Sequence, residues 1–311
     1  MKKPSVTRLM LFLFSVALSS SPANSLVQAT PAGTIPVSMV VSVEAKHGGE
    51  VPAINREDVR ALHGNTRLRV TDWVALQGDQ AELELFVLLD EASDPNIGMQ
   101  FDDLRQFMSG QPATTAIAVG YMRYGTVDIV QKLTKDHAKA GKSLRLPLGS
   151  GVSASPYLSM SDLMKHWPES AARREIFLIS SGIDRLYGGP NDPYLAEAIE
   201  QAQRAGIQIY AIYASAVGHF GHSFWRFSWG QNNLSQLADE TGGEFYFQGF
   251  QTPIAFKPFL DEFADRLKHQ YKVTFLAIPE NKASYQRVRF ETEVPNAELV
   301  ASDRVYVPTA K

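Results

Sequence analysis

Five short, near-continuous apolar runs constrain the fold of this 311-residue chain more than any other feature. The runs are Leu83 to Asp90, Thr114 to Met122, Glu175 to Ser180, Ile207 to Ala214 and Tyr271 to Ile278. Such runs are typical of central strands in a sheet that is covered on both faces. Stretches with helical spacing of apolar residues separate them. The alternation predicts a doubly wound, mostly parallel α/β sheet with helices on both faces over residues 81–279.

The segments on either side of this region have a different pattern. Pro36 to Ala45 is rich in valine and alternates in polarity, which predicts a half-buried strand in an N-terminal β extension over residues 30–80. Arg287 to Val294 and Leu299 to Val307 predict further strands within residues 280–311. We expect the two terminal segments to pack together as a small β region.

The first residues of the chain have the pattern of an export signal. A basic start with Lys2, Lys3 and Arg8 precedes the apolar run LMLFLFSVAL, and serine-rich sequence follows. We predict a signal peptide over residues 1–25, with cleavage after Ser25 or Ala29, and a secreted or periplasmic mature protein. An uncleaved anchor is the alternative, although the run has about half of the ~20 residues that a membrane span needs. We expect membrane contact only through this signal.

Composition excludes several classes of protein. The formal charge of −3 becomes −6 once the leader, with three basic and no acidic residues, is removed. A mildly acidic chain without a basic stripe is a poor nucleic-acid binder, so we expect no nucleic-acid partner. The absence of cysteine excludes disulfides, thiol catalysis and cysteine-ligated metals.

Ligands of doubly wound sheets bind beyond the carboxyl ends of the strands, so the loops there carry the candidate chemistry. One loop begins with Asp90 and includes Asp94, and another reads Ser180-Ser181-Gly182-Ile183-Asp184. A serine-rich stretch from Gly149 to Pro156 precedes a predicted helix. Carboxylate and hydroxyl oxygens of this kind suit a hard divalent cation.

The order FVLLD, EIFLISSGID, AIEQAQRAGIQIYAIYA, LSQLADETGGEFYF and HQYKVTFLAIPE resembles a von Willebrand factor type A (VWFA) domain of secreted bacterial proteins. The resemblance covers Leu83 to Pro279 and implies a Rossmann-like fold. It also implies a metal-ion-dependent adhesion site (MIDAS), whose first loop in the family reads Asp-x-Ser-x-Ser. Here Ala92 stands at the first serine and Ser181 at the family's second aspartate, which makes the site degenerate.

The resemblance places six residues at or beside the ligand positions, and they are Asp90, Asp94, Ser153, Ser155, Ser181 and Asp184. One reading is a site for Mg²⁺ or another divalent cation. In the alternative reading, Asp90 hydrogen-bonds loop amides, and Ser153 and Ser155 cap the helix that begins at Pro156.

A segment after the strand that ends at Ala214 is dense in aromatic residues. Its candidate partner-binding residues are His219, His222, Phe224, Trp225, Arg226 and Trp229. Exposed aromatics beside an arginine are typical of interface hot spots, although the same rings could instead cover a neighbouring helix.

The sequence therefore predicts a secreted or periplasmic, non-enzymatic protein-binding module whose protein partner meets the carboxyl end of the sheet. The sequence has no phosphate-binding loop, zinc-protease motif or nucleophile elbow. The alternative function is a metal-assisted hydrolase or phosphoryl transferase that uses Asp90 at the strand end. A third possibility is a structural subunit with an inactive site.

Overall fold

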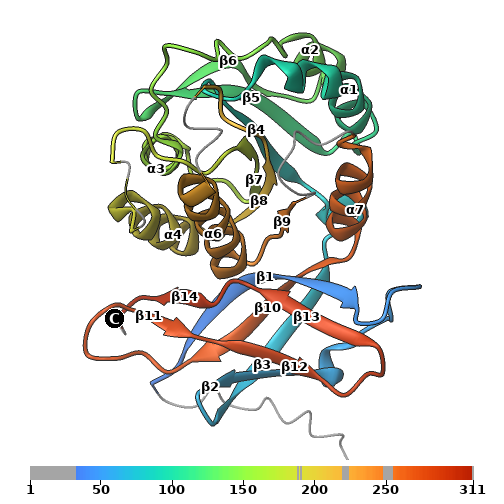
Figure 1. Ribbon diagram of the computed structural model, residues 1–311. Coiled ribbons are helices and arrows are strands. Elements are labelled where there is room, and N and C mark those ends of the chain that lie inside the picture. Colours follow the sequence, from blue (N-terminus) through green and yellow to red (C-terminus); the bar gives the residue numbers. More distant parts are fainter. Residues whose placement is uncertain (1–32, 188, 190, 219–223, 248–254, 310–311) are drawn as a thin grey trace, which may run out of the picture. The chain divides into compact units, whose positions relative to one another are not determined.

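The structure, a computed structural model, describes residues 33–187, 189, 191–218, 224–247 and 255–309. The predicted signal peptide lies outside these residues. The described chain contains an α/β region and a β region, each with its own six-stranded sheet (Figure 1).

The sheet of the α/β region is mostly parallel. Its strands are β4 (Leu83–Asp90), β5 (Thr115–Arg123), β6 (Thr126–Thr134), β7 (Arg173–Ser180), β8 (Ile207–Tyr213) and β9 (Phe245–Tyr246). They lie in the order β6-β5-β4-β7-β8-β9, and all neighbours are parallel except β5 and β6, which form an edge hairpin. The first strand is thus internal and the chain winds outward to both sides, which confirms the predicted doubly wound fold.

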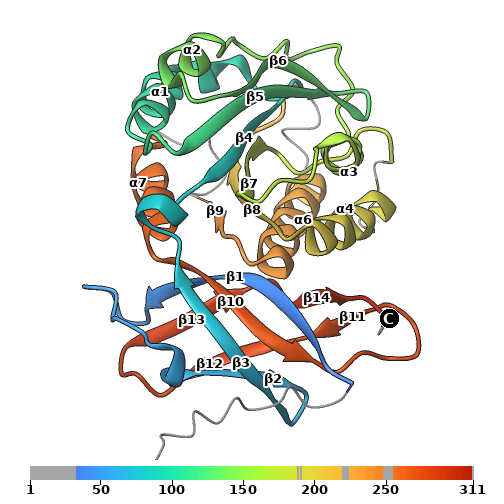
Figure 2. The same ribbon diagram turned by 180° about the vertical axis from the view of Figure 1, so that it is seen from behind.

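Two sets of helices cover the two faces of this sheet (Figures 1 and 2). The first set is α1 (Phe101–Ser109), α2 (His137–Lys142) and α7 (Lys257–Lys268), and the second is α3 (Pro156–His166), α4 (Pro193–Ala205) and α6 (Phe224–Thr241). Leu85 and Val87 of β4 face the first set, whereas Phe86 and Leu88 face the second. A strand that buries both faces has apolar residues at successive positions, which explains the run LELFVLLD.

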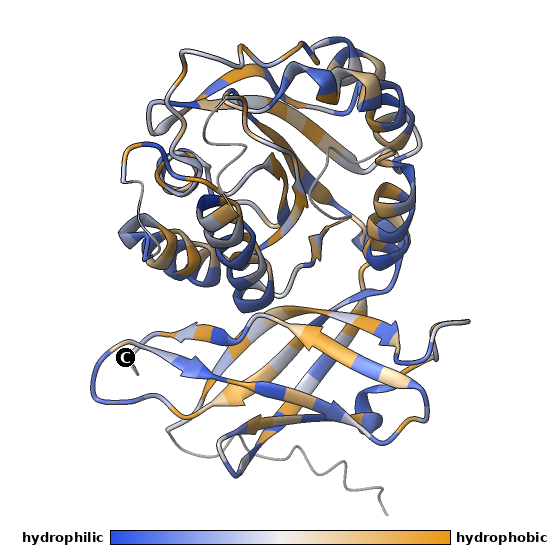
Figure 3. Cartoon of the chain, viewed as in Figure 1, coloured by the Kyte–Doolittle hydropathy of each residue, from blue (hydrophilic) through white to orange (hydrophobic). Residues whose placement is uncertain are grey.

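The helix ends follow local sequence signals. Asp192 caps α4 by accepting a hydrogen bond from the Tyr194 amide, and Pro193 follows at the first helical position. The helix ends at Gly206, which adopts a left-handed conformation with a φ of 64°. Figure 3 shows the resulting pattern, with apolar residues along the strands and polar residues on the outer sides of the helices.

The β region brings the two ends of the described chain together. Its strands are β1 (Ile35–Ala45), β2 (Val59–His63), β3 (Thr66–Ala75), β10 (Gln270–Ala277), β11 (Ser284–Arg287), β12 (Arg289–Thr292), β13 (Ala297–Ala301) and β14 (Arg304–Val307). The larger sheet has the order β12-β2-β3-β10-β1-β13, and β11 pairs with β14. Residues near the start of the chain therefore pair directly with residues near its end, as between β1 and β13.

One predicted strand belongs to a different sheet from the one expected. Tyr271 to Ile278 was expected in the parallel sheet, but β10 pairs antiparallel with β1 and β3 of the β region. The predicted strand is therefore confirmed, but its predicted place in the parallel sheet is wrong. The physical reason is that β10 is internal in its sheet and ends in three fully or nearly buried residues, Phe275 to Ala277, so its sequence gives no clear alternation.

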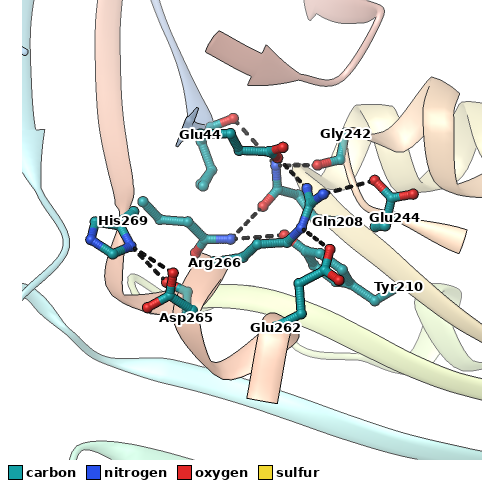
Figure 4. Close-up of polar contacts among 11 residues, drawn as sticks. Glu44, Gln208, Tyr210, Gly242, Glu244, Glu262, Asp265, Arg266 and His269 are labelled. Carbon is teal, nitrogen blue, oxygen red and sulfur yellow. Dashed lines mark hydrogen bonds and ion pairs between the residues drawn. The ribbon is translucent and has the colours of Figure 1, made fainter. Parts of the chain in front are cut away.

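Polar contacts connect β1 and β10 with the amino end of the parallel sheet (Figure 4). Arg266 of α7 forms ion pairs with Glu44 of β1 and with Glu244, which lies 2.8 Å away. Gln270 of β10 donates a hydrogen bond to the side-chain oxygen of Gln208 in β8, at 2.9 Å. Three short 3-10 helices complete the described elements, η1 (Arg56–Asp58), η2 (Gly78–Gln80) and η3 (Pro95–Gln100).

Candidate functional site at the carboxyl end of the parallel sheet

The carboxyl ends of the parallel strands bring the predicted loops together. β4 ends at Asp90, β7 at Ser180 and β8 at Tyr213. Three backbone contacts connect the loop after β4 with the loop after β8. Asp94 N donates a hydrogen bond to Ser215 O, and Val217 N donates one to Ala92 O. Between them, Ser93 and Ala216 form an antiparallel β-bridge. Segments far apart in the sequence therefore form one continuous loop layer.

Asp90 lies beneath this layer and is 1% exposed. One carboxylate oxygen accepts a hydrogen bond from the Ala92 amide at 2.8 Å, and the other accepts one from the Ser180 hydroxyl at 2.9 Å. Burial raises the pKa of Asp90 to about 6, although the two hydrogen bonds and the positive charge of Arg185 oppose the rise. Asp90 thus holds its own loop to the end of β7.

Glu91, the next residue, holds the loop that precedes α3. Its side chain is fully buried, forms an ion pair with Arg145 and accepts a hydrogen bond from the Leu148 amide at 2.8 Å. The Arg145 guanidinium also lies over the ring of Tyr121, 3.8 Å from the ring centroid. The sequence alone gave Glu91 no role. Glu91 follows Asp90 directly, and nothing in the local sequence indicates which loop its side chain contacts.

Ser155 and Asp184 meet directly. The Ser155 hydroxyl donates to the Asp184 carboxylate, whose other oxygen accepts hydrogen bonds from the amides of Leu186 and Tyr187. Ser155 precedes α3 at the capping position, but its side chain makes no capping hydrogen bond there. Burial, together with the charge of Asp184, raises the pKa of the adjacent Asp192 to about 6.

The remaining predicted ligand positions also have local roles. Asp94 caps η3 by accepting a hydrogen bond from the Asn96 amide at 2.9 Å. The main-chain oxygen of Ser153 accepts a hydrogen bond from Tyr124 N, and the hydroxyl of the buried Ser181 accepts one from Ile183 N. The structure therefore brings the six residues to one end of the sheet and distributes them over three loops.

Arg185 supplies positive charge to the same layer. Its guanidinium donates to the main-chain oxygens of Val152 at 3.0 Å and of Val217 at 3.2 Å, and its amide donates to Ala154 at 2.9 Å. One side chain thus connects the loop before α3, the loop after β7 and the loop after β8. Burial lowers the pKa of Arg185, and the negative charge of Asp90 opposes that change.

As arranged here, these residues do not fit the divalent cation that the family's adhesion site would hold. Within the described residues, no group of three or more His, Cys, Asp or Glu side chains has an arrangement that suits a metal ion. The carboxylates of Asp90, Asp94 and Asp184 all accept hydrogen bonds from the chain itself. The positive charge of Arg185 also acts on Asp90. A divalent cation bound at Asp90 would be repelled by that charge.

The aromatic segment is described only in part, since His219 and His222 lie outside the described residues. Phe224 and Trp225 begin α6, are 63% and 68% exposed, and contact each other edge to face at 5.8 Å. Arg226 and Trp229 are half-buried. The buried Phe227 packs edge to face on Tyr213 at 5.1 Å, so this ring anchors the helix while the first two rings face solvent.

Exposed apolar side chains lie in or beside the loops at this end of the sheet, and we call them the apolar rim. The rim consists of Met99, Leu146, Leu148, Leu186, Tyr187, Phe224 and Trp225. These are seven of the twelve large apolar side chains that are exposed in the described part of the chain. A Cβ atom at Gly98 would collide with Leu146, which shows that two rim loops touch.

Comparison with known proteins finds distant structural similarity only. No protein-family model and no curated protein matches the chain. A von Willebrand factor type A structure from Catenulispora acidiphila shares 11% identity, covers 89% of this chain and 75% of its own, and has a TM-score of 0.44. An aerotolerance-related membrane protein from Bacteroides fragilis shares 12% identity over 60% of this chain and 98% of its own, with a TM-score of 0.44.

The von Willebrand factor domain of a type V pilus tip protein from Porphyromonas gingivalis shares 11% identity, covers 60% of this chain and 94% of its own, and has a TM-score of 0.41. The chain's own strand order, with an internal first strand and one antiparallel edge strand, is that of a doubly wound α/β sheet. None of the described helices has the length and hydropathy of a membrane span.

Proposed function

We propose that this protein is an exported, non-enzymatic binding module that holds a protein partner on the apolar rim. The observation that carries the proposal is the concentration of exposed apolar side chains at the carboxyl end of the sheet, where folds of this type bind ligands. The predicted signal peptide supports a secreted or periplasmic location.

The composition of the rim favours a protein as the partner. Trp225, Phe224 and Tyr187 are large, rigid side chains of the types that dominate interface hot spots. The backbone amide of Tyr187 donates a hydrogen bond to the buried Asp184, and Phe224 and Trp225 lie in the first turn of α6, so little conformational entropy is lost when a partner binds. The acidic net charge gives no attraction for nucleic acid.

Burial of the acidic residues argues against the alternative of a hydrolase or phosphoryl transferase. Asp90 is 1% exposed and Glu91 is fully buried, so a substrate could reach neither carboxylate without displacement of the loop layer. A nucleophile or general base must lie within hydrogen-bonding reach of the reacting group. The carboxylates instead serve to hold the loops in place.

To test this function, the exported full chain is chemically crosslinked to its neighbours in the cells that produce it. The amount of the specific partner that is recovered with the chain is then measured. The variant Phe224→Ser/Trp225→Ser removes two rim rings, and Ile278→Ser removes an exposed apolar side chain of the β region as a matched control. We expect the rim variant to lose roughly thirtyfold in recovery of the specific partner, because a hot-spot substitution costs about 2 kcal/mol. The control should retain that partner, and a chelator should change neither result.

Two results would reject this function. Equal loss in the rim variant and in Ile278→Ser would show that the rim has no special role. Full retention in the rim variant, with unchanged thermal unfolding, would place the partner elsewhere. Because the two rings are exposed, their replacement should leave the unfolding free energy within about 0.5 kcal/mol of the parent.

A further inference from the structure

A buried negative charge and a half-buried positive charge face the same loop layer at the carboxyl end of the sheet. Asp90 lies under the layer, and the Arg185 guanidinium lies within it. In the family that the sequence resembles, a site at this position holds a divalent cation, and the residues present here do not fit one. Hydrogen bonds from the Ala92 amide and the Ser180 hydroxyl stabilise the ionised form of Asp90, and the positive charge of Arg185 adds to them, since a buried carboxylate without compensation is strongly disfavoured.

The contacts of Arg185 place its charge next to the Asp90 loop. The guanidinium donates to Val217 O, and the amide of the same Val217 donates to Ala92 O at 3.1 Å. Ala92 N in turn donates to the Asp90 carboxylate. The positive group is therefore one residue away from the turn that binds Asp90.

The second contact of the guanidinium reaches across the site. Val152 O accepts a hydrogen bond from it, and Val152 lies in the serine-rich loop where the family has another ligand. A metal ion connects loops by accepting oxygen lone pairs from each of them. A planar guanidinium can make similar connections by donating several hydrogen bonds in fixed directions.

We propose that Arg185 replaces the divalent cation at this site. Its side chain compensates the charge of Asp90, connects the loops before α3 and after β8, and makes the arrangement of the loop layer independent of metal. The site is then permanently assembled, and neither chelators nor added cations change it. This inference concerns the chain alone and holds whether or not the apolar rim binds a partner.

The first test is direct titration of the exported chain with Mn²⁺, followed by calorimetry and by the electron paramagnetic resonance signal of the free ion. We expect no binding that depends on Asp90 up to about 1 mM, a concentration that saturates ordinary protein sites for such ions. Asp90→Asn is the matched variant, because the amide oxygen can still accept the Ala92 hydrogen bond. Saturable Mn²⁺ binding that Asp90→Asn abolishes would overturn the proposal.

The second test is a double-mutant cycle between Arg185→Gln and Asp90→Asn, measured by denaturant unfolding at about pH 8, where Asp90 is ionised. We expect Arg185→Gln to reduce the folded-to-unfolded ratio at least tenfold more in the parent than in the Asp90→Asn background. Arg174→Gln is the control, since Arg174 donates to Ala205 O at the opposite end of β7. It should show the same effect in both backgrounds.

Additive effects of Arg185→Gln and Asp90→Asn, within about twofold, would contradict charge compensation. If Arg185→Gln does not fold in the parent background, recovery of folding by Asp90→Asn supports the proposal, and failure to fold in both backgrounds counts against it. The proposed binding function is tested with rim variants, so the two ideas can fail separately.

Discussion

The two ends of the parallel sheet both bury charged side chains, but they present different surfaces. At the amino end, Arg266 and Gln270 make contacts with Glu44 and Gln208 that connect the α/β and β regions. At the carboxyl end, the charged groups connect loops of one region to each other, and apolar side chains face solvent around them. Buried polar contacts thus give rigidity at both ends, whereas the exposed apolar groups concentrate at one.

The difference teaches how the carboxyl end can keep an apolar surface. An apolar rim on mobile loops would tend to collapse onto itself. Here the loop backbones are held from below by Glu91, Asp184 and Arg185, so the side chains above them stay separated. The amino end has no such requirement, because its polar groups are covered by the β region.

The largest expected effect comes from Arg266→Ala at the amino end. The Arg266 side chain is 11% exposed and pairs with Glu44 and Glu244, so its loss leaves carboxylates without a cation. We expect a decrease of about 3 to 5 kcal/mol in the free energy of unfolding near pH 8. The deficit should be smaller near pH 5, because burial already raises the pKa values of both glutamates and protonation removes their charge.

Arg56→Ala is the control for this change, because Arg56 forms an ion pair with Glu57 in which both side chains are more than half exposed. Its loss should cost at most about 1 kcal/mol. Denaturant unfolding of the three proteins at both pH values measures the difference. Equal effects of the two substitutions would mean that the buried contacts do not stabilise the amino end.

A smaller effect is expected from Glu175→Gln in β7. Burial raises the pKa of Glu175 to about 7, although the Arg173 guanidinium, 4.0 Å away, opposes the rise. The pKa of this carboxyl group is higher in the folded chain than in the unfolded chain, so ionisation favours the unfolded chain. The free energy of unfolding of the parent should therefore fall as the pH rises from about 4.5 to 7. The shift corresponds to about 3 kcal/mol. Glu175→Gln should recover much of it near pH 8 and little near pH 4.5.

Exposed Glu169 provides the matched control, and Glu169→Gln should change the pH profile of unfolding little. The difference between the Glu175→Gln and parent profiles isolates this group from Asp90 and Asp192, whose pKa values are also raised. A difference that does not vary with pH would show that Glu175 is not buried as a carboxylate.

Much of the fold could be predicted because each central strand has its own local pattern. LELFVLLD indicates a strand covered on both faces, and the structure places its alternate residues in two separate cores. The sheet that contains β10 could not be predicted in this way. An apolar run reports burial of the strand, but it does not identify the neighbouring strands.

Less of the candidate site could be predicted. Asp90 and Asp184 could be proposed from the sequence because acidic residues after apolar strands form a recognisable pattern, and Ser155 because the family resemblance points to the serine-rich loop before α3. Arg185 and Glu91 were missed because a single charged residue in a loop has no periodicity, and only the folded chain shows what it contacts. Met99, Leu146 and Leu148 were missed for the same reason, whereas the density of rings around Trp225 was visible in the sequence.

The most direct test of the central claim is hydrogen exchange of the exported chain, alone and with its crosslink-identified partner, at equal ionic strength and in the presence of a chelator. The account predicts slower exchange in the loops at residues 95–100, 145–149 and 185–187 and at the start of α6, with little change in the β region. Slower exchange confined to the β region, or complete loss of the complex in chelator, would contradict it.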